Sequence, residues 1–254
     1  MGVVVDQARA MVAAGAREIV LTGVDITSYG GDLPGRPRLG QLARRLLALV
    51  PGLPRRRLSS LDPAALDDDL WRLIAEEPRF MPHLHLSAQH GADLMLKRMK
   101  RRHLGADLRA LTERAKSLRP GIAFGADLIA GFPTETEDDF ARMIAMVEEA
   151  GLSFLHVFPF SPRPGTPAAR MPQLPVALRR ERAARLRAAG RARARDFLES
   201  RIGQHEIVLV ERDGRGHTEH FAPVRIRGAA PPPGGLHRMR ATAILDDALL
   251  VEAA

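Results

Sequence analysis

Cysteine is absent from all 254 positions of the chain. This absence excludes disulfides, thiolate zinc sites, cysteine nucleophiles and iron–sulfur clusters ligated by cysteines of this chain. No apolar run approaches the length of about eighteen residues that a membrane span requires, so no segment is predicted to cross a membrane. The first ten residues carry Asp6 and Arg9 and indicate a helix rather than an export signal. We therefore expect a cytoplasmic protein.

Lysine is nearly absent as well. Only Lys97, Lys100 and Lys116 occur, which leaves 35 arginines among the 38 basic residues and a net charge of +8. Arginine suits phosphate recognition because its planar fork binds pairs of oxygens, and a basic surface attracts nucleic acid. A genome bias toward Arg, Ala, Gly and Pro explains the same composition. Charge alone therefore does not establish RNA binding.

The first two hundred residues alternate between strand-like and helix-like segments. Strands are predicted at 18–24, 55–61, 83–89, 122–132 and 153–160. Helices are predicted at 2–14, 39–50, 62–76, from about 90 to 118 with a break near Gly105, from Thr134 onward, and at 175–200. Such alternation predicts a parallel sheet, either an open doubly wound sheet or a barrel. No GxGxxG follows any of these strands, which argues against a dinucleotide-binding fold.

Two helix starts have recognisable signatures. Asp62 is an N-cap followed by Pro63 at the first helical position, which predicts a helix running to about residue 76. Thr134 and Glu137 have the spacing of a capping box. The helix that they open is predicted to bury one apolar stripe, made of Phe140, Ile144 and Val147.

The last fifty residues change character. Residues 206–212, 217–227, 237–245 and 247–252 alternate like strands, separated by a turn at 213–214 and a Pro/Gly-rich loop at 228–235. This pattern predicts a small all-β domain, such as a five-stranded barrel of the kind that often binds nucleic acid. We therefore divide the chain into residues 1–200 and residues 201–254.

A polar or Gly/Pro-rich turn follows each of the five strands. In chain order these turns are TGVDITSYGG, SSLDP, SAQHGAD, AGFPTETE and FPFSPRPGTPAAR. In α/β barrels and open α/β sheets, ligands bind at the C-terminal ends of the strands. Ordinary turn chemistry explains any one of these turns. The occurrence of all five favours one composite ligand site.

Three other polar groups have weaker signals. His83 and His85 share one face of a predicted strand with His103 within reach, so they form a candidate metal set. Hydrogen-bonded core histidines explain the same pattern, and we assign no metal site. The acidic run 67–69 indicates helix capping rather than metal binding. The arginine-rich segment 179–195 faces either phosphates or solvent, and the sequence leaves both interpretations open.

Taken together, the turns resemble one family, the threonylcarbamoyladenosine tRNA methylthiotransferases of the radical SAM enzymes. The matching stretches are REIVLTGVDITSYG, RRLSSLDP, MPHLHLSAQHGAD, LKRMKRRH, FGADLIAGFPTETEDDF and HVFPFSPRPGTPAARMPQ. ERDGRGHTEHFAPVR is similar to the RNA-binding β-domain of that family. The resemblance implies a partial (β/α) radical-SAM-type barrel without its first strand, followed by a small all-β RNA-binding domain.

The resemblance also implies a reaction and its components. Members of the family methylthiolate C2 of N6-threonylcarbamoyladenosine in the tRNA anticodon loop, using S-adenosylmethionine and [4Fe–4S] clusters. The implied partners are tRNA and, for the complete enzyme, an electron donor; the resemblance leaves the oligomeric state open. The family's CxxxCxxC loop and its N-terminal domain precede the part that MGVVVDQ resembles. We therefore assign no catalytic residue and expect this chain alone to be inactive; the alternative is a non-catalytic tRNA-binding fragment.

Site residues follow from the resemblance position by position. Gly23 and Asp25 occupy the turn that meets the methionine amino group, Ser87 and Gln89 reach the ribose, and Arg101 pairs with the methionine carboxylate. The segments that pack against the adenosine contain Asp127, Ile129, Gly131, Glu135, Phe158 and Ser161. The substrate side is implied to contain Arg163, Gly165 and Thr166. The chain departs from the family pattern at His90, where a small residue is usual, and at Thr134, where glycine is common.

Overall fold

The computed structural model describes residues 1–253, and its first two hundred residues contain the predicted alternation of strands and helices. The strands are β1 (Glu18–Leu21), β2 (Arg55–Leu58), β3 (His83–Gln89), β4 (Ala123–Ala130) and β5 (Phe154–Pro159). The α-helices are α1 (Gly2–Ala13), α2 (Leu39–Leu49), α3 (Asp68–Glu76), α4 (Asp93–Arg98), α5 (Gly105–Leu118), α6 (Glu137–Glu149) and α7 (Val176–Arg201). All five predicted strands are therefore present, although most are a few residues shorter than expected.

Every pairing among these strands is parallel. β1 pairs with β2, and β3, β4 and β5 form a second sheet in that order. Isolated parallel bridges from Arg56 to Phe80 and from Leu61 to Leu86 connect the two sheets. The predicted α/β class with a parallel sheet is therefore confirmed.

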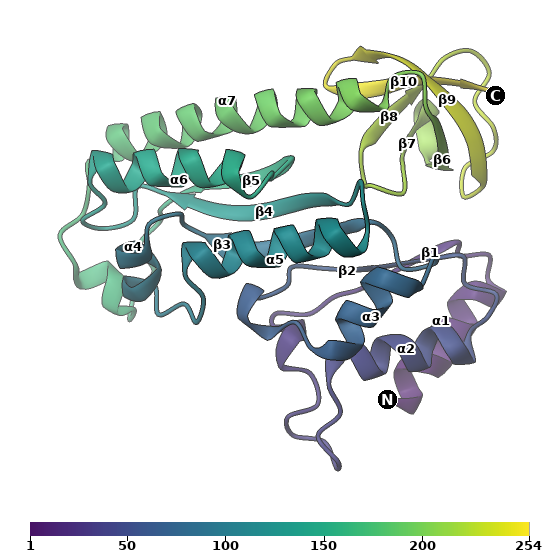
Figure 1. Ribbon diagram of the computed structural model, residues 1–254, viewed down its shortest axis with the longest axis horizontal. Coiled ribbons are helices and arrows are strands. Elements are labelled where there is room, and N and C mark those ends of the chain that lie inside the picture. The colour runs from purple at the N-terminus through teal and green to yellow at the C-terminus, as the bar shows by residue number, and fades with distance from the viewer. Residues whose placement is uncertain (254) are drawn as a thin grey trace.

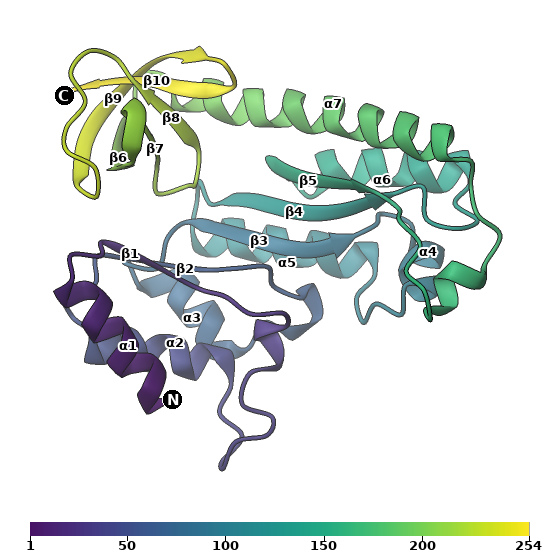
Figure 2. The same ribbon diagram turned by 180° about the vertical axis from the view of Figure 1, so that it is seen from behind.

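Helices cover only one face of the β3–β5 sheet. Figure 1 shows α5 and α6 in front of the sheet, and Figure 2 shows the opposite face without a helical layer. Leu84 and Leu86 are buried on the helical side. Because side chains alternate along a strand, His85 and Ser87 project from the open face. The same alternation places Asp127 on the open face of β4.

The helix predicted to begin at Asp62 is interrupted. Asp62 caps only a 3₁₀ turn, η2 (Pro63–Ala65), by accepting a hydrogen bond from the Ala64 N–H at 3.0 Å. The chain then returns to an extended conformation, and α3 begins anew with Asp67 as its N-cap. Asp67 Oδ1 accepts from the Leu70 N–H at 2.9 Å, which agrees with the capping role predicted for the acidic run.

The capping box of α6 lies two residues later than predicted. Thr136 Oγ1 accepts from the Asp139 N–H at 3.1 Å, and Asp139 Oδ2 accepts from the Thr136 N–H at 3.0 Å. Thr134 instead has a left-handed backbone, with φ +65°, in the turn before the helix. Ile144 is only partly buried, so the predicted stripe was wrong at this position. The fully buried residues of the helix are Phe140, Met143, Met146 and Val147.

The final segment folds into a closed five-stranded barrel at the end of α7 (Figure 1). Its strands are β6 (His205–Val210), β7 (Arg215–His217), β8 (Pro223–Ile226), β9 (Leu236–Leu245) and β10 (Ala248–Ala253), in the order β10-β8-β7-β6-β9. The predicted all-β segment is confirmed, but the strand expected at 217–227 is two strands. They are separated by a turn in which the Phe221 N–H donates to the Thr218 carbonyl at 3.0 Å. Among residues 1–253, no helix has the length and apolar character needed to cross a bilayer.

Buried charges join the barrel to the first sheet. The Glu18 side chain is 6% exposed, and its Oε1 lies 2.9 Å from Arg57 Nε and 3.0 Å from His217 Nε2. Arg57 also donates to the Glu219 carbonyl at 2.9 Å and to the Thr218 carbonyl at 2.8 Å. Burial raises the pKa of Glu18, but the His217 hydrogen bond and the Arg57 charge outweigh it and leave this pKa below 4.5. The carboxylate form of Glu18 therefore stabilises the junction.

We expect Glu18→Gln to lower the free energy of unfolding by roughly 3 kcal/mol at pH 7, because it leaves Arg57 buried beside a neutral group. A carboxyl with a lowered pKa contributes stability above its unfolded value, and this contribution is lost as pH falls through the folded value. The difference between the two proteins should therefore shrink below about pH 4.5. Denaturant unfolding at several pH values measures this difference in the free energy of unfolding. The control, Glu181→Gln in an exposed pair, should change stability by less than about 1 kcal/mol, and an equal loss in both variants would contradict this role of Glu18.

Candidate functional site

Two adjoining cavities open at the C-terminal ends of β3, β4 and β5. One measures about 420 Å³ and the other about 510 Å³, and they share Gln89, Ile129, Thr166 and Ala168. Most of the residues predicted from the sequence line one or both cavities: Gln89, Arg101, Asp127, Ile129, Phe158, Ser161, Arg163 and Thr166. Parallel strands bring these positions together because their C-terminal ends meet at one edge of the sheet.

Gln89 has an unusual backbone at the shared wall of the two cavities. Its φ is +66°, in the left-handed region that few residues other than glycine adopt. Such strain persists where the surroundings enforce it, and it concentrates at ligand sites. The end of β3 therefore has a strained backbone where the two cavities meet.

Arg101 reaches the same wall from the loop after α4. Its Nη2 donates to the Ser87 carbonyl at 3.1 Å and lies 3.5 Å from Asp62 Oδ2. Its Nε is buried and has no hydrogen-bond partner among the described residues. The guanidinium is thus fixed in place at the wall of the smaller cavity. The Ser87 backbone carbonyl supports Arg101, and the Ser87 side chain is half-buried.

The loop after β5 closes the other side. Thr166 Oγ1 donates to the Arg163 carbonyl at 2.8 Å and caps the 3₁₀ turn η3 (Pro167–Arg170). Gly165 has φ +83°, so the loop turns through a conformation that glycine adopts without strain. These contacts bring Arg163 and Thr166 to the cavity wall, while Gly165 shapes the turn between them.

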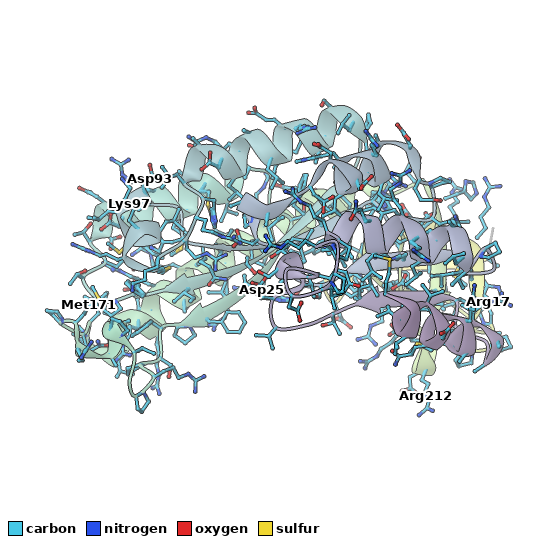
Figure 3. The ribbon with its side chains drawn as sticks, turned by 90° about the horizontal axis from the view of Figure 1, so that it is seen from below. Arg17, Asp25, Asp93, Lys97, Met171 and Arg212 are labelled. Atoms are coloured by element: carbon cyan, nitrogen blue, oxygen red, sulfur yellow. The ribbon has the colours of Figure 1, made fainter. Side chains whose placement is uncertain are left out.

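Gly23 and Asp25 lie apart from these cavities. They line a separate groove of about 540 Å³ between β1, α1 and α2. The Asp25 carboxylate accepts from Thr27 Oγ1 at 2.6 Å and from Ser28 Oγ at 2.5 Å, which lowers its pKa. Figure 3 shows Asp25 near the middle of the molecule, away from the end that carries Lys97 and Met171. Gly23 and Asp25 therefore do not line the two cavities at the strand ends.

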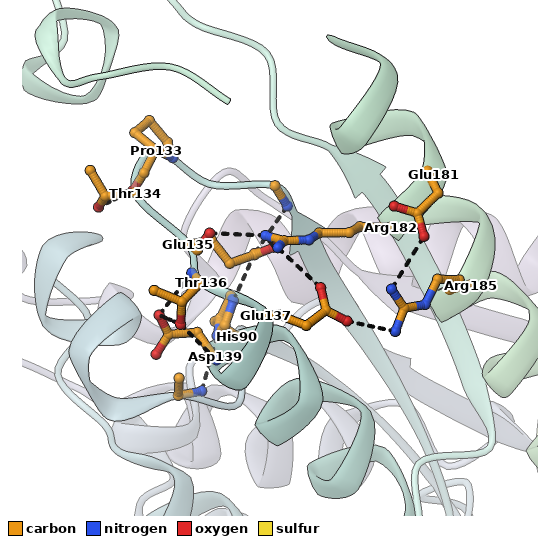
Figure 4. Close-up of polar contacts among 12 residues, drawn as sticks. His90, Pro133, Thr134, Glu135, Thr136, Glu137, Asp139, Glu181, Arg182 and Arg185 are labelled. Carbon is orange, nitrogen blue, oxygen red and sulfur yellow. Dashed lines mark hydrogen bonds and ion pairs between the residues drawn. The ribbon is translucent and has the colours of Figure 1, made fainter. Parts of the chain in front are cut away.

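Glu135 lies behind the cavities rather than in their lining (Figure 4). Its side chain is fully buried, with Oε2 2.9 Å from His90 Nε2 and 3.0 Å from the Gly131 N–H. Oε1 accepts from Arg182 Nη1 at 2.7 Å. Gly131 is equally enclosed, since a Cβ there would lie 3.0 Å from the Arg179 Cα. Both residues therefore position the strand ends and do not face the cavity.

Asp127 is the acidic residue on the open face of β4. Its Oδ1 lies 3.0 Å from His85 Nε2 and 3.2 Å from His156 Nδ1, and its Oδ2 accepts from Ser60 Oγ at 3.1 Å. Burial raises the pKa of Asp127, but these hydrogen bonds and the nearby imidazoles outweigh it and leave this pKa below its ordinary value. No local pattern in the sequence singles out His156, because only the pairing of β4 with β5 places it beside Asp127.

The three histidines of the candidate metal set are not brought together among the described residues. His103 Nε2 lies 3.1 Å from the Ala88 carbonyl, and the residue is buried in the core. The His83 ring stacks on Phe221, with centroids 5.4 Å apart. Of the three histidines, only His85 contacts a carboxylate on the open face. The group that the structure brings together is therefore His85, Asp127 and His156.

The arginines of α7 serve mainly the fold. Arg182 is buried against Glu135, and Arg179 and Arg187 donate to the carbonyls of Phe160 and Val157 at 2.9 and 3.0 Å. Further arginines of α7 pair with acidic residues: Arg185, Arg193, Arg195 and Arg201. Most arginines of α7 therefore make contacts within the protein, rather than facing only phosphates or only solvent.

The cavity lining suits a nucleoside that carries an amino-acid moiety. Ile129 and Phe158 provide apolar surface for a base in the larger cavity, and the Arg101 guanidinium at the wall of the smaller cavity provides a positive charge for a carboxylate. S-adenosylmethionine has both features, so the residues present fit it. An iron–sulfur cluster does not fit, because the chain contains no cysteine to ligate it.

A double-mutant cycle on Glu135→Gln and Arg182→Met tests the buried pair behind the site. We expect each single variant to lose roughly 3 kcal/mol of unfolding free energy, because each removes one charge of a buried ion pair. The double variant should lose less than the sum of the two. Urea unfolding gives the three differences. Additive losses would mean that Glu135 and Arg182 stabilise the fold independently.

Comparisons with known proteins agree with this geometry. Residues 1–147 match the sequence profile of the Radical SAM superfamily. The chain is 49% identical over 226 residues to the threonylcarbamoyladenosine tRNA methylthiotransferase MtaB of Rickettsia prowazekii, covering 89% of this chain and 54% of that protein. It is 37% identical over 243 residues to a tRNA-2-methylthio-N(6)-dimethylallyladenosine synthase of Cereibacter sphaeroides, covering 93% and 55%. The chain thus spans about half the length of the curated relatives it matches.

Solved structures match at the level of the fold. Coproporphyrinogen III oxidase from Escherichia coli gives a TM-score of 0.51 at 18% identity, covering 73% of this chain and 44% of that one. The radical S-adenosylmethionine methyltransferase TsrM from Kitasatospora setae gives a TM-score of 0.51 at 17% identity, covering 65% and 31%. The similarity to tRNA methylthiotransferases that the motifs indicated is confirmed, and the chain belongs to the radical SAM superfamily.

Proposed function

We propose that this chain provides the S-adenosylmethionine pocket and the RNA-binding domain of a tRNA methylthiotransferase that modifies C2 of N6-threonylcarbamoyladenosine. The observation that carries the proposal is the 49% identity to a protein of that name over 89% of this chain. The two cavities at the ends of β3–β5 support it, because their linings combine the apolar surface of Ile129 and Phe158 with the guanidinium of Arg101. The division between residues 1–200 and 201–254 is part of the proposal; α7 ends at Arg201 and β6 begins at His205.

In this proposal the residues of the cavity bind and orient. Arg101 pairs with the methionine carboxylate, while Ile129 and Phe158 contact the adenine. Gln89 approaches the ribose, since its strained backbone fixes it at the cavity wall. When bound, S-adenosylmethionine supplies the methyl group and the radical chemistry of the superfamily. Gly131 and Glu135 act indirectly, by holding the end of β4 in place.

RNA binding is proposed for the barrel rather than for α7. The exposed arginines of the barrel are Arg212, Arg215, Arg227, Arg238 and Arg240. None of these five makes an ion pair with a described residue. On α7 five arginines do make ion pairs, namely Arg182, Arg185, Arg193, Arg195 and Arg201, whereas Arg180 and Arg191 are exposed and make none with the described residues. Solvated guanidinium groups without acidic partners bind phosphates at the lowest cost, because no existing pair has to be broken.

Salt-dependent tRNA binding tests this assignment. The double variant Arg212→Gln/Arg215→Gln should weaken tRNA binding about tenfold at moderate salt. It should also flatten the dependence of log K on log salt by about 0.7 for each phosphate that is no longer neutralised. The matched control is Arg193→Gln/Arg195→Gln, in which both arginines belong to exposed pairs on α7. Equal weakening in both double variants, measured by filter binding, would argue against the barrel as the RNA-binding surface.

The purified 254-residue chain should not methylthiolate tRNA, because it has no thiolate to hold a cluster. The measurement is mass spectrometry of nucleosides after incubation with tRNA, S-adenosylmethionine, iron, sulfide and a reductant. We also expect weak S-adenosylmethionine binding. Methylthiolated nucleoside formed by a preparation of intact mass 27.8 kDa would contradict the prediction. Salt-dependent tRNA binding without chemistry would support the alternative function, a non-catalytic tRNA-binding module.

A further inference from the structure

Three metal-binding side chains converge on the open face of the sheet. His85, Asp127 and His156 come from β3, β4 and β5, and each offers a ligand atom within 4.8 Å of the other two. Asp127 is the register partner of His156, and His85 is the partner of Gly125, two residues before Asp127. Because side chains two residues apart share one face of a strand, all three project to the same side.

The carboxylate is oriented by a contact from outside the group. Ser60 Oγ donates to Asp127 Oδ2 at 3.1 Å, which leaves Oδ1 turned toward both imidazoles. Contacts of this kind around metal ligands fix the ligand orientation and tune affinity. Gly125 makes room beside them, since a Cβ there would lie 2.5 Å from His85 Nδ1. The arrangement is thus built by four strand and loop segments, and not by chance proximity on a mobile surface.

The group also has an open side. Asp127 lines the larger of the two cavities at the strand ends, and the His156 side chain is 63% exposed. The imidazole of His85 is largely enclosed, at 13% exposure. A bound ion would therefore have protein ligands on one side and solvent or a further ligand on the other.

We propose that His85, Asp127 and His156 form a binding site for a first-row divalent transition-metal ion such as Zn²⁺. Two imidazoles and one carboxylate suit these ions, whereas Mg²⁺ and Ca²⁺ take sets made of oxygen. Three protein ligands leave at least one coordination position for water or another molecule. The inference depends only on the geometry of these residues and is independent of the proposed tRNA modification.

Cobalt provides a direct probe. The untagged chain, treated with chelator and dialysed, is titrated with Co²⁺ while the visible ligand-field absorption is followed. Thiolate ligands cannot contribute to the spectrum, because the chain has no cysteine. We expect one equivalent of Co²⁺ to bind, with displacement by Zn²⁺. Asp127→Asn and His156→Ala should each weaken binding at least tenfold, and Ser60→Ala should weaken it by about tenfold.

Two controls keep the outcome decisive. His205→Ala removes an exposed histidine of the barrel and should leave Co²⁺ affinity unchanged. His156 is exposed, so its variant should retain the thermal unfolding midpoint of the parent chain even if Asp127→Asn does not. Absence of a saturable Co²⁺ spectrum, or equal affinity in His156→Ala and the parent chain, would overturn the proposal and leave the group as hydrogen-bonded histidines that support Asp127.

Discussion

The buried carboxylate of Glu135 fixes the part of the structure on which the cavities depend. It accepts hydrogen bonds from the Gly131 N–H after β4 and from Arg182 on α7, and it pairs with His90 after β3. The Ala92 N–H donates to His90 Nδ1 at 2.9 Å, so the proton that bonds Glu135 is on Nε2. One side chain thus joins two strand ends to the helix that packs beside them (Figure 4). These contacts give the Glu135 carboxylate of the GFPTETE segment a structural role.

A second buried group of charges, at the other end of the sheet, acts in the same way. Arg55 and Arg57 project from β2 toward the barrel, where they donate to the carbonyls of Ile207, Thr218 and Glu219. Glu18 compensates this charge from β1. The net free energy of a buried ion pair is small, while an unpaired buried charge is costly. Loss of either partner would therefore cost more than the intact pair contributes, and these contacts tie the position of the barrel to that of β1 and β2.

The sequence predicted the elements better than their contacts. Strand-like segments identified all five strands of the two sheets, most of them by apolar runs that burial imposes, although β2 has the sequence RRRL and buries three arginines. Helix starts were less certain where two capping residues compete, as at Asp62 and Asp67. Gln89 and Phe158, which were predicted from the strand ends, both line the cavities. Glu135 belongs to the same motif as the cavity residues yet points into the core, and His156 acquires a partner only through strand pairing. The local spacing of residues determines neither the inward orientation of Glu135 nor the contact of His156 with Asp127.

The positions of the cavities and of the barrel constrain any ligand that touches both. The cavities lie at the C-terminal ends of the strands, whereas the barrel packs against β1 and β2 near the start of β4 (Figure 2). Between the cavities and the barrel, the open face carries a series of rings. The ring centroids of His156 and His85 are 4.7 Å apart, and those of His83 and Phe221 of the barrel are 5.4 Å apart. Phe221 is 46% exposed and has a left-handed backbone, φ +64°. The rings within reach of a ligand that spans both regions are therefore Phe221 and His156, because His83 and His85 are largely enclosed, and exposed flat rings are surfaces on which bases stack.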